Sequence, residues 1–336
     1  MLREITKKIL RKEDATFEES HQALNAILNG QCEPVPIAAL LTALAAKGET
    51  AQEMAGMARA LRDHAVPVRP KTAPLVDIVG TGGDGRSTFN ISTTAALVTA
   101  GAGIAVAKHG NRAITSKCGS ADVLAELGVR IDAAPETIER CIDEANIGFM
   151  FAPNHHPAMK YVQPIRKALG FRTAFNILGP LANPASVPIQ ITGVARPYLL
   201  EVMAEALNLL GVQRAMIVHG DGIDEFTTCG PTDIAELHDG RISRHTLDYS
   251  DYGFAGAQVS DLAGGSLADN VAITRGIIEG KDTGPRCDVV LFTAAAAIMI
   301  ADKAPGLTEG IALARESISS GKATQALNKL IEISNS

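Results

Sequence analysis

A Gly-rich turn flanked by polar and basic residues is the part of the sequence best suited to chemistry. The apolar run from Leu75 to Val79 leads into Gly80-Thr81-Gly82-Gly83-Asp84-Gly85. Glycines let a backbone turn so that its N–H groups face a phosphate without Cβ atoms in the way. Between Gly85 and Ala121 the chain has no Asp or Glu, and its cations there are Arg86, Lys108, Arg112 and Lys117. The stretch therefore predicts a site for a phosphorylated ligand.

Two other interpretations of the Gly turn stay open from the residues alone. Gly80, Gly82 and Gly85 match the G-x-G-x-x-G pattern of dinucleotide-binding folds. Those folds start a helix within the glycines and place an acidic residue about 20 positions later. Here residues 86–91 are still polar, the helical pattern begins near Ala95, and no acid lies at that distance, so the match is poor. A purely structural Gly turn is the second alternative.

A basic loop follows the next predicted strand, at residues 104–107. Residues 108–120 hold Lys108, Arg112 and Lys117 among small and polar residues. Loops that follow neighbouring parallel strands emerge at the same edge of a sheet. We expect this loop and the Gly turn to face one ligand, although a solvated surface loop would have a similar composition.

Two further clusters could serve such a site. Asp224 and Glu225 come soon after a predicted strand, at residues 215–219, where paired carboxylates suit magnesium; a solvated Asp-Gly turn is the alternative. His155 and His156 have no acidic or Cys companion close by, so a metal role is not expected for them. Arg166 could hold a carboxylate with its planar guanidinium, or could be a surface charge.

Composition limits the class of protein. The chain has 336 residues, 46% of them hydrophobic and 20% charged, and a net charge of -6. The acidic balance argues against nucleic-acid binding, which needs a basic face. The five cysteines form no C-x-x-C pair, which indicates reduced thiols and no zinc site. Met1 leads into a charged amphipathic segment, and no apolar run is long enough to span a membrane. We therefore expect a cytoplasmic protein.

The pattern of apolar residues predicts an α/β protein with a small N-terminal helical domain. Residues 1–70 read as helices, with capping boxes at Thr16 and Thr50. From residue 71 to 336, short apolar runs alternate with helical patterns, which predicts a mostly parallel central sheet. A helix is expected to begin at Pro157, with apolar residues at helical spacing from Met159 to Leu169, and we expect residues 157–182 to join the helical domain in space. Strands are predicted at 75–79, 104–107, 147–151, 188–194, 215–219 and 289–292, and helices near 92–100, 120–127, 135–145, 197–210 and after Ala294.

Six motifs in this order resemble the anthranilate phosphoribosyltransferase family. They are Gly80-Thr81-Gly82-Gly83-Asp84-Gly85, Asn90-Ile91-Ser92-Thr93, Lys108-His109-Gly110-Asn111-Arg112, Gly119-Ser120-Ala121-Asp122, Gly179-Pro180-Leu181-Ala182-Asn183-Pro184 and Asp224-Glu225. The resemblance covers almost the whole chain. It implies the nucleoside phosphorylase/phosphoribosyltransferase fold and a homodimer. The implied reaction belongs to tryptophan biosynthesis: anthranilate and phosphoribosyl diphosphate give N-(5-phosphoribosyl)anthranilate and diphosphate.

The resemblance also implies site residues. Magnesium, as two ions per subunit, would be held by Ser92, Asp224 and Glu225, and anthranilate would contact Gly80, Asn111 and Arg166. No residue is assigned as an acid or base. The residues implied around phosphoribosyl diphosphate are Gly80, Gly83, Asp84, Thr88, Asn90, Ile91, Ser92, Thr93, Lys108, His109, Gly110, Asn111, Arg112, Ala113, Ile114, Thr115, Ser116 and Ser120.

The implied chemistry suits these residue types. Diphosphate is a charged leaving group, so magnesium and preorganised N–H and Lys donors would stabilise it. Removal of Lys108 is expected to weaken phosphoribosyl diphosphate use with little loss of fold. Two alternatives remain: a pyrimidine nucleoside phosphorylase, whose pattern has Lys and Ser where this chain has Ile78 and Val79, and a non-catalytic nucleic-acid-binding relative. The chain departs from the family at Phe292-Thr293, where Leu-Asn is expected, outside the motifs.

Overall fold

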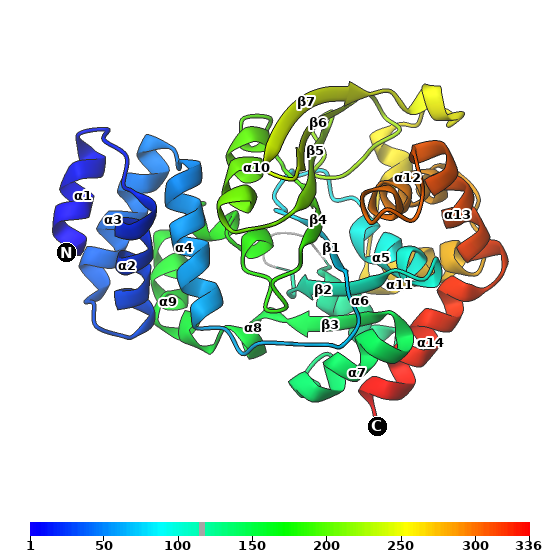
Figure 1. The fold of residues 1–336 in the computed structure, drawn as a ribbon, viewed down its shortest axis with the longest axis horizontal. Helices are drawn as coiled ribbons and strands as arrows, with labels where there is room; N and C mark the ends of the chain where they lie inside the picture. Colours follow the sequence, from blue (N-terminus) through cyan, green and yellow to red (C-terminus); the bar gives the residue numbers. More distant parts are fainter. Residues whose placement is uncertain (114–117) are drawn as a thin grey trace.

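A helical bundle and a larger α/β region lie side by side in the computed structural model, which describes residues 1–113 and 118–336. The N-terminus lies in the bundle, and the C-terminus lies beyond the sheet (Figure 1). None of the helices in the described residues is long and apolar enough to cross a membrane. The expected combination of a small helical unit with an α/β fold is confirmed.

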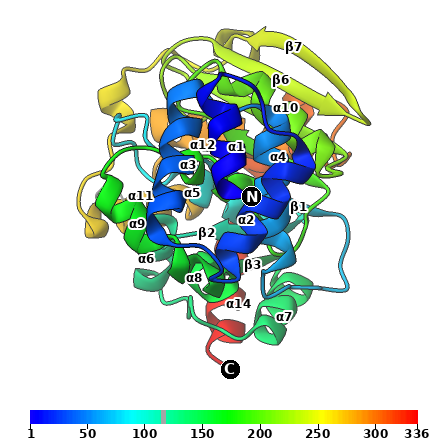
Figure 2. The ribbon, with the colours of Figure 1, turned by 90° about the vertical axis from the view of Figure 1, so that its left-hand side faces the viewer.

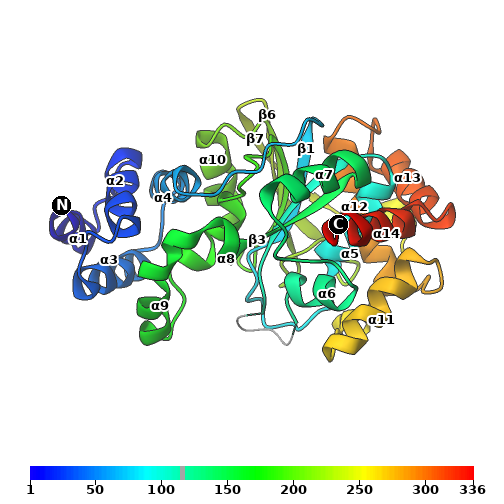
Figure 3. The ribbon, with the colours of Figure 1, turned by 90° about the horizontal axis from the view of Figure 1, so that it is seen from below.

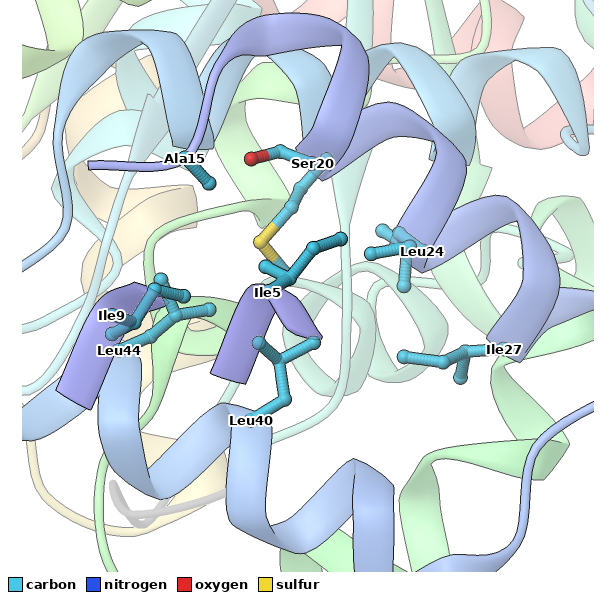
Figure 4. A pocket seen from close by; sticks show the side chains of 10 residues that line it. Ile5, Ile9, Ala15, Ser20, Leu24, Ile27, Leu40 and Leu44 are labelled. Carbon is cyan, nitrogen blue, oxygen red and sulfur yellow. The ribbon is translucent and has the colours of Figure 1, made fainter. Parts of the chain in front are cut away.

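Capping residues and apolar stripes define the N-terminal bundle. Thr16 accepts a hydrogen bond from the Glu19 N–H, and Glu19 accepts one from the Thr16 N–H, which is the predicted capping box; Thr50 and Glu53 form the second. The small pocket at the centre of the bundle is lined by aliphatic side chains, one methionine and one serine, so it offers no charged group to a ligand (Figure 4). The helices are α1 (Leu2–Leu10), α2 (Phe17–Leu28), α3 (Pro34–Lys47) and α4 (Ala51–Asp63).

The central sheet has seven strands in the order β3-β2-β1-β4-β5-β6-β7. The first five strands in this order are parallel, so their carboxyl ends share one edge. Gly80 at the end of β1 lies opposite Gly193 at the end of β4. The strands are β1 (Leu75–Gly80), β2 (Ala105–Gly110), β3 (Ile147–Phe151), β4 (Ile189–Gly193), β5 (Arg214–Gly220), β6 (Thr232–His238) and β7 (Arg241–Leu247).

Helices cover both faces of the sheet. Val76 and Ile78 of β1 belong to the core shared with α5 and α12, whereas Leu75 belongs to a second cluster with residues of α7. This alternation is expected for a strand buried on both faces. The helices of this region are α5 (Ile91–Gly101), α6 (Ser120–Glu126), α7 (Pro135–Ala145), α10 (Leu199–Leu209), α11 (Leu267–Ile278), α12 (Pro285–Ile300), α13 (Leu307–Ser319) and α14 (Lys322–Ser334).

The strand predicted at residues 289–292 is wrong, because these residues lie inside helix α12. A short apolar run reads the same in a buried strand and in a helix that is buried all round. Phe292 is fully buried and packs against the rings of Phe226, Tyr252 and Phe254. The departure from the family at this position therefore belongs to the core.

The antiparallel hairpin β6–β7 was not predicted. Asp239 and Gly240 connect its strands, both with positive φ, of 47° and 82°. An Asp-Gly pair between alternating sequences is a strong hairpin signal. Because Asp239 and Gly240 lie between two such runs, the sequence contained this signal. The hairpin forms one edge of the sheet (Figure 2).

The segment 152–182 leaves the sheet after β3 and reaches the bundle. Its helix α9 packs against α3 (Figure 3), and Val162 and Ile165 share the core of the bundle. The single helix expected from Pro157 is divided, because Pro164 has no N–H with which to continue the hydrogen-bond ladder. The short elements of the segment are α8 (Ala152–His155), 3₁₀ helix η1 (Pro157–Tyr161), α9 (Gln163–Leu169), η2 (Ala174–Asn176) and η3 (Gly179–Leu181).

Candidate functional site

The Gly turn after β1 lies directly under the carboxylates predicted to bind magnesium. The Thr81 N–H donates to the Gly193 carbonyl at 2.9 Å, and the Gly82 N–H donates to Asp224 Oδ2 at 2.6 Å. A Cβ on Gly193 would come within 1.6 Å of the Asp224 carbonyl oxygen. The strand ends of β1 and β4 must therefore be glycine for the chain at Asp224 to cross so closely.

Three carboxylates influence one another at this crossing. Burial raises the pKa of Asp224, and the nearby charges of Glu225 and Asp84 raise it further. Burial raises the pKa of Glu225 to about 7, although Lys108 and Ser92 oppose the shift. Asp84 Oδ2 is buried and has no hydrogen-bond donor among the described residues. Such a group of carboxylates is short of positive charge.

The oxygen ligands available at the crossing suit a hard cation such as magnesium. Carboxylate oxygens are the ligands that magnesium prefers. The Ser92 N–H donates to Glu225 Oε1 at 3.2 Å, so the side chain of Ser92 also lies at this point, in the first turn of α5. Within residues 1–113 and 118–336 no three His, Cys, Asp or Glu side chains are already arranged around one point as a metal cage. Substrate oxygens or water would thus have to complete the coordination.

Lys108 is a buried charge of β2 rather than a residue of the following loop. The strand extends to Gly110, beyond the predicted end at residue 107. Lys108 is 2% exposed, and its Nζ donates to the Ile78 carbonyl at 2.6 Å. Burial lowers the pKa of Lys108, while Asp77 and Glu225 favour its charged form. The ammonium therefore offsets part of the negative charge of Asp77 and Glu225.

Asp77 connects this charge to the segment at residue 183. Burial raises the pKa of Asp77 to about 6, against the opposing effects of Lys108 and the hydrogen bond from Asn183. Asn183 Nδ2 donates to Asp77 Oδ2 at 2.8 Å and to the Ala107 carbonyl at 2.9 Å. The expected site did not include Asp77 or Asn183, although Asp77 was visible as a charged residue within an otherwise apolar strand.

Asp122 holds the described ends of the basic loop. Its Oδ1 accepts from Arg112 Nη1 at 2.7 Å, and its Oδ2 accepts from the N–H groups of Ala113 and Gly119. The Asn111 carbonyl accepts from the Ala121 N–H at 3.2 Å. Asp122 was missed as a positioning residue, although Gly-Ser-Ala-Asp is a helix-capping pattern. Ile114, Thr115 and Ser116 lie outside the described residues.

Several residues predicted to bind phosphoribosyl diphosphate carry buried polar atoms without partners. The N-terminal end of α5 is formed by Asn90 to Thr93, and Thr88 forms a β-bridge with Ala263. Buried polar groups in proteins nearly always have a hydrogen-bond partner. The lack of such partners is typical of a site that completes its hydrogen bonds with a ligand. With residues 114–117 left aside, the atoms of this set that lack a partner are Asp84 Oδ2, Asn90 Oδ1, Thr93 Oγ1 and His109 Nε2.

A pair of buried histidines lies next to Asp77. The ring of His109 packs edge to face on the ring of His156, with centroids 5.2 Å apart. The backbone N–H of His109 donates to Asp77 Oδ1 at 3.4 Å. Burial lowers the pKa of His156 to about 4 and that of His109 well below its usual value. Both rings are therefore neutral near pH 7.

The helical side presents two arginines with different surroundings. Arg166 on α9 is partly buried, lies over the Phe175 ring at 5.4 Å, and donates to Gln163 Oε1 at 3.4 Å. Arg172 instead extends to the Gly turn, where its Nη2 donates to the Gly82 carbonyl at 3.2 Å. The site thus joins the edge of the sheet to the segment 157–182.

Two family models match the chain over most of its length. The model described as "Glycosyl transferase family, a/b domain" matches residues 72–324, and the one described as "Glycosyl transferase family, helical bundle domain" matches residues 3–65. A protein of Methanocorpusculum labreanum named anthranilate phosphoribosyltransferase is 49% identical over 335 residues, covering 99% of this chain and 98% of its own.

Solved structures agree with the sequence comparison. The anthranilate phosphoribosyltransferase of Thermus thermophilus superposes with a TM-score of 0.94 at 43% identity, covering 99% of both chains. The corresponding protein of Saccharomyces cerevisiae, in complex with PRPP and Mg, superposes with a TM-score of 0.90 at 32% identity, covering 99% of this chain and 98% of its own. A further structure of the yeast protein contains 4-fluoroanthranilate.

Removal of the Lys108 charge is expected to cost stability, which changes the expectation drawn from the sequence. Lys108→Met keeps the length of the side chain but leaves Asp77 and Glu225 without their buried cation. Leaving a buried charge without the opposite charge that compensates it costs about 3 kcal/mol or more. Urea denaturation measures the loss. Lys108→Met combined with Asp77→Asn should recover part of it, and a single variant as stable as the wild type would contradict the assigned role.

The buried His156 ring is expected to make stability depend on pH. The folded ring stays neutral down to pH about 4, whereas the unfolded ring binds a proton below pH 6.5. The contribution of the neutral ring is thus complete above pH 6.5 and is lost as the pH falls towards 4. Between pH 7 and pH 5 the wild type should lose about 2 kcal/mol more than His156→Gln. Urea denaturation at both pH values tests this, and parallel losses would contradict it.

Proposed function

The chain belongs to the anthranilate phosphoribosyltransferase family, and from this premise we propose which residues carry out its reaction. The enzyme is a pentosyltransferase of tryptophan biosynthesis. It transfers the 5-phosphoribosyl group of phosphoribosyl diphosphate to the amine of anthranilate and releases diphosphate. The single observation that carries the assignment of roles is the crossing of the Asp224–Glu225 segment over the Gly turn.

The phosphate end of the substrate is proposed to bind at the carboxyl edge of the sheet. The N–H groups of the Gly turn and of the first turn of α5 are the donors nearest to the carboxylates there. Charge develops on diphosphate as its bond to the ribose C1 breaks, and donors fixed in advance stabilise that charge. The unpartnered atoms of Asp84, Asn90 and Thr93 support this placement.

Magnesium is proposed to bind through Asp224, Glu225 and Ser92, as two ions in each subunit. The raised pKa of Asp224 and the free Asp84 oxygen support a cation at this place. The ions would supply the positive charge that a diphosphate leaving group requires. Lys108 contributes because its ammonium favours the ionised form of the Glu225 carboxylate.

Anthranilate is proposed to lie between Gly80, Asn111 and Arg166. An aromatic amine is already nucleophilic, so the site has only to orient it towards the ribose C1. The carboxylate beside the amine needs a cation, and the guanidinium of Arg166 is a planar donor suited to it. The neutral rings of His109 and His156 leave that carboxylate to Arg166, since neither ring carries charge near pH 7.

We also propose that residues 1–70, joined by 157–182, move as one domain against residues 71–336. The shared core of α9 and the bundle supports the grouping. Closure of this domain would bring anthranilate to the ribose.

The enzyme is further proposed to be a cytoplasmic homodimer. A partner subunit would cover two apolar side chains of the bundle, Leu10 and Val35, which are 69% and 78% exposed. Sedimentation velocity tests this by measuring whether the particle has the mass of one chain or of two.

Loss of the paired acids is expected to raise the magnesium requirement. Asp224→Asn with Glu225→Gln replaces ionised oxygen ligands by neutral ones. Anthranilate fluorescence, followed while magnesium is titrated at saturating phosphoribosyl diphosphate, should give a midpoint at a higher concentration. Asp221→Asn, an exposed acid on the same turn, is the control and should match the wild type. If the magnesium titration curves of the double variant and the wild type coincide, Asp224 and Glu225 are residues of an ordinary turn and do not bind magnesium.

Arg166→Ala is expected to impair the acceptor selectively. Removing one member of a buried charge pair costs about 2 to 5 kcal/mol, so kcat/KM for anthranilate should fall at least about tenfold. Phosphoribosyl diphosphate binding, measured by calorimetry without acceptor, should stay near wild type. Lys167→Ala, at the exposed neighbouring position, is the matched control. Equal losses for both substrates would assign Arg166 to domain packing, and no loss would place the acceptor elsewhere.

A further inference from the structure

Arg172 crosses from the helical side to the phosphate-binding turn. It follows α9 and Gly170, whose left-handed conformation ends that helix. The side chain reaches a residue 90 positions earlier in the chain, where Nη2 donates to the Gly82 carbonyl at 3.2 Å. No residue between 157 and 182 other than Arg172 has a hydrogen bond to the Gly turn among the described contacts.

The Gly turn leaves room for this guanidinium. Gly83 has a φ of +79°, and a Cβ built there would lie 1.4 Å from Arg172 Nη1 and 2.5 Å from its Cζ. The guanidinium therefore occupies the space that any side chain at position 83 would fill. Gly83 is needed at this point both for its backbone conformation and for the approach of Arg172.

The charge of Arg172 is not used within the described chain. Arg172 takes part in none of the ion pairs among residues 1–113 and 118–336. A guanidinium has five N–H donors, and the neutral Gly82 carbonyl takes one of them. A diphosphate oxygen is a stronger acceptor, since hydrogen bonds between ionised groups are about twice as strong as neutral ones.

We propose that Arg172 is a further binding residue for the diphosphate group of phosphoribosyl diphosphate. Its guanidinium leaves the Gly82 carbonyl for the diphosphate oxygens when the substrate enters. This inference rests on the proposed function, because it needs the diphosphate to lie at the Gly turn. Two arginines of the helical side then have different roles: Arg166 holds the acceptor, and Arg172 holds the leaving group.

The placement of Arg172 has a consequence for domain closure. Residue 172 belongs to the segment that packs on the bundle, whereas the Gly turn belongs to the sheet. A contact between Arg172 and diphosphate joins the two through the ligand. Because the product diphosphate keeps that contact after the ribose has been transferred, Arg172 also slows its release.

The test compares Arg172→Ala and Arg172→Lys with the control Lys167→Ala. Calorimetry with magnesium and inorganic pyrophosphate, and separately with phosphoribosyl diphosphate, measures the affinity of each full-length protein. We expect Kd for both to rise about 10- to 100-fold in Arg172→Ala, which is the range for a lost hydrogen bond to a charged group. Arg172→Lys should fall between, and the control should match the wild type. The KM for anthranilate at saturating phosphoribosyl diphosphate should change less than about threefold.

Chemical rescue separates binding from a structural role. Added guanidinium ion should restore part of the pyrophosphate affinity of Arg172→Ala, which a purely structural defect would not permit. Wild-type affinity in Arg172→Ala, or a loss that guanidinium does not restore and that comes with a lower Tm, overturns the inference and leaves the proposed function standing. A wild type that binds neither phosphoribosyl diphosphate nor pyrophosphate overturns both.

Discussion

The site depends on the electrostatic interaction of one buried cation, the ammonium of Lys108, with two buried acids, Asp77 and Glu225. Asp77 inside the sheet and Glu225 at the sheet's edge both favour its charged form, and each of these carboxylates is itself buried. Desolvation alone would neutralise all three groups. Lys108 favours the ionised forms of Asp77 and Glu225, whereas burial still raises the pKa of Asp224 and Glu225, and a magnesium ion would favour their ionised forms further. The fold therefore gathers acidic side chains that a cation would stabilise at the place where the diphosphate is proposed to bind.

The same network extends towards the helical side through the side-chain amide of Asn183. Asn183 joins Asp77 and the Ala107 carbonyl, and it lies just beyond the segment that carries Arg166 and Arg172. The bundle and the sheet are thus connected to one set of buried polar groups. The connecting segment is therefore anchored at both ends, in the core of the bundle and at the sheet.

Close backbone approach is the second requirement of the site. Gly80 and Gly193 end adjacent parallel strands, and the chain at Asp224 crosses directly above them. Side chains at either position would push the carboxylates away from the Gly82 N–H. The glycine motif therefore serves two purposes: it exposes backbone donors, and it lets a segment from more than 140 positions later in the chain share those donors.

Local patterns in the sequence determined much of this protein. The capping boxes at Thr16 and Thr50, the parallel strands and the motifs that resemble the family were all readable from residue types and spacing, because each depends on neighbours within a few positions. The hairpin at Asp239-Gly240 was readable as well. The strand expected at residues 289–292 failed, since an apolar run that is buried all round carries no period with which to distinguish helix from strand.

Tertiary structure alone decided how charges from distant segments meet. Lys108 looked like a loop cation, and only the pairing of β2 with its neighbours shows that it is buried beside Asp77 and Glu225. Arg172 looked like one of several arginines, and only the return of the segment 157–182 to the Gly turn places it against Gly83. A charged side chain has the same appearance in a sequence whether it meets water, a carboxylate or a ligand. Burial and partners are properties of contacts between residues far apart in the chain, and they exist only once the chain has folded.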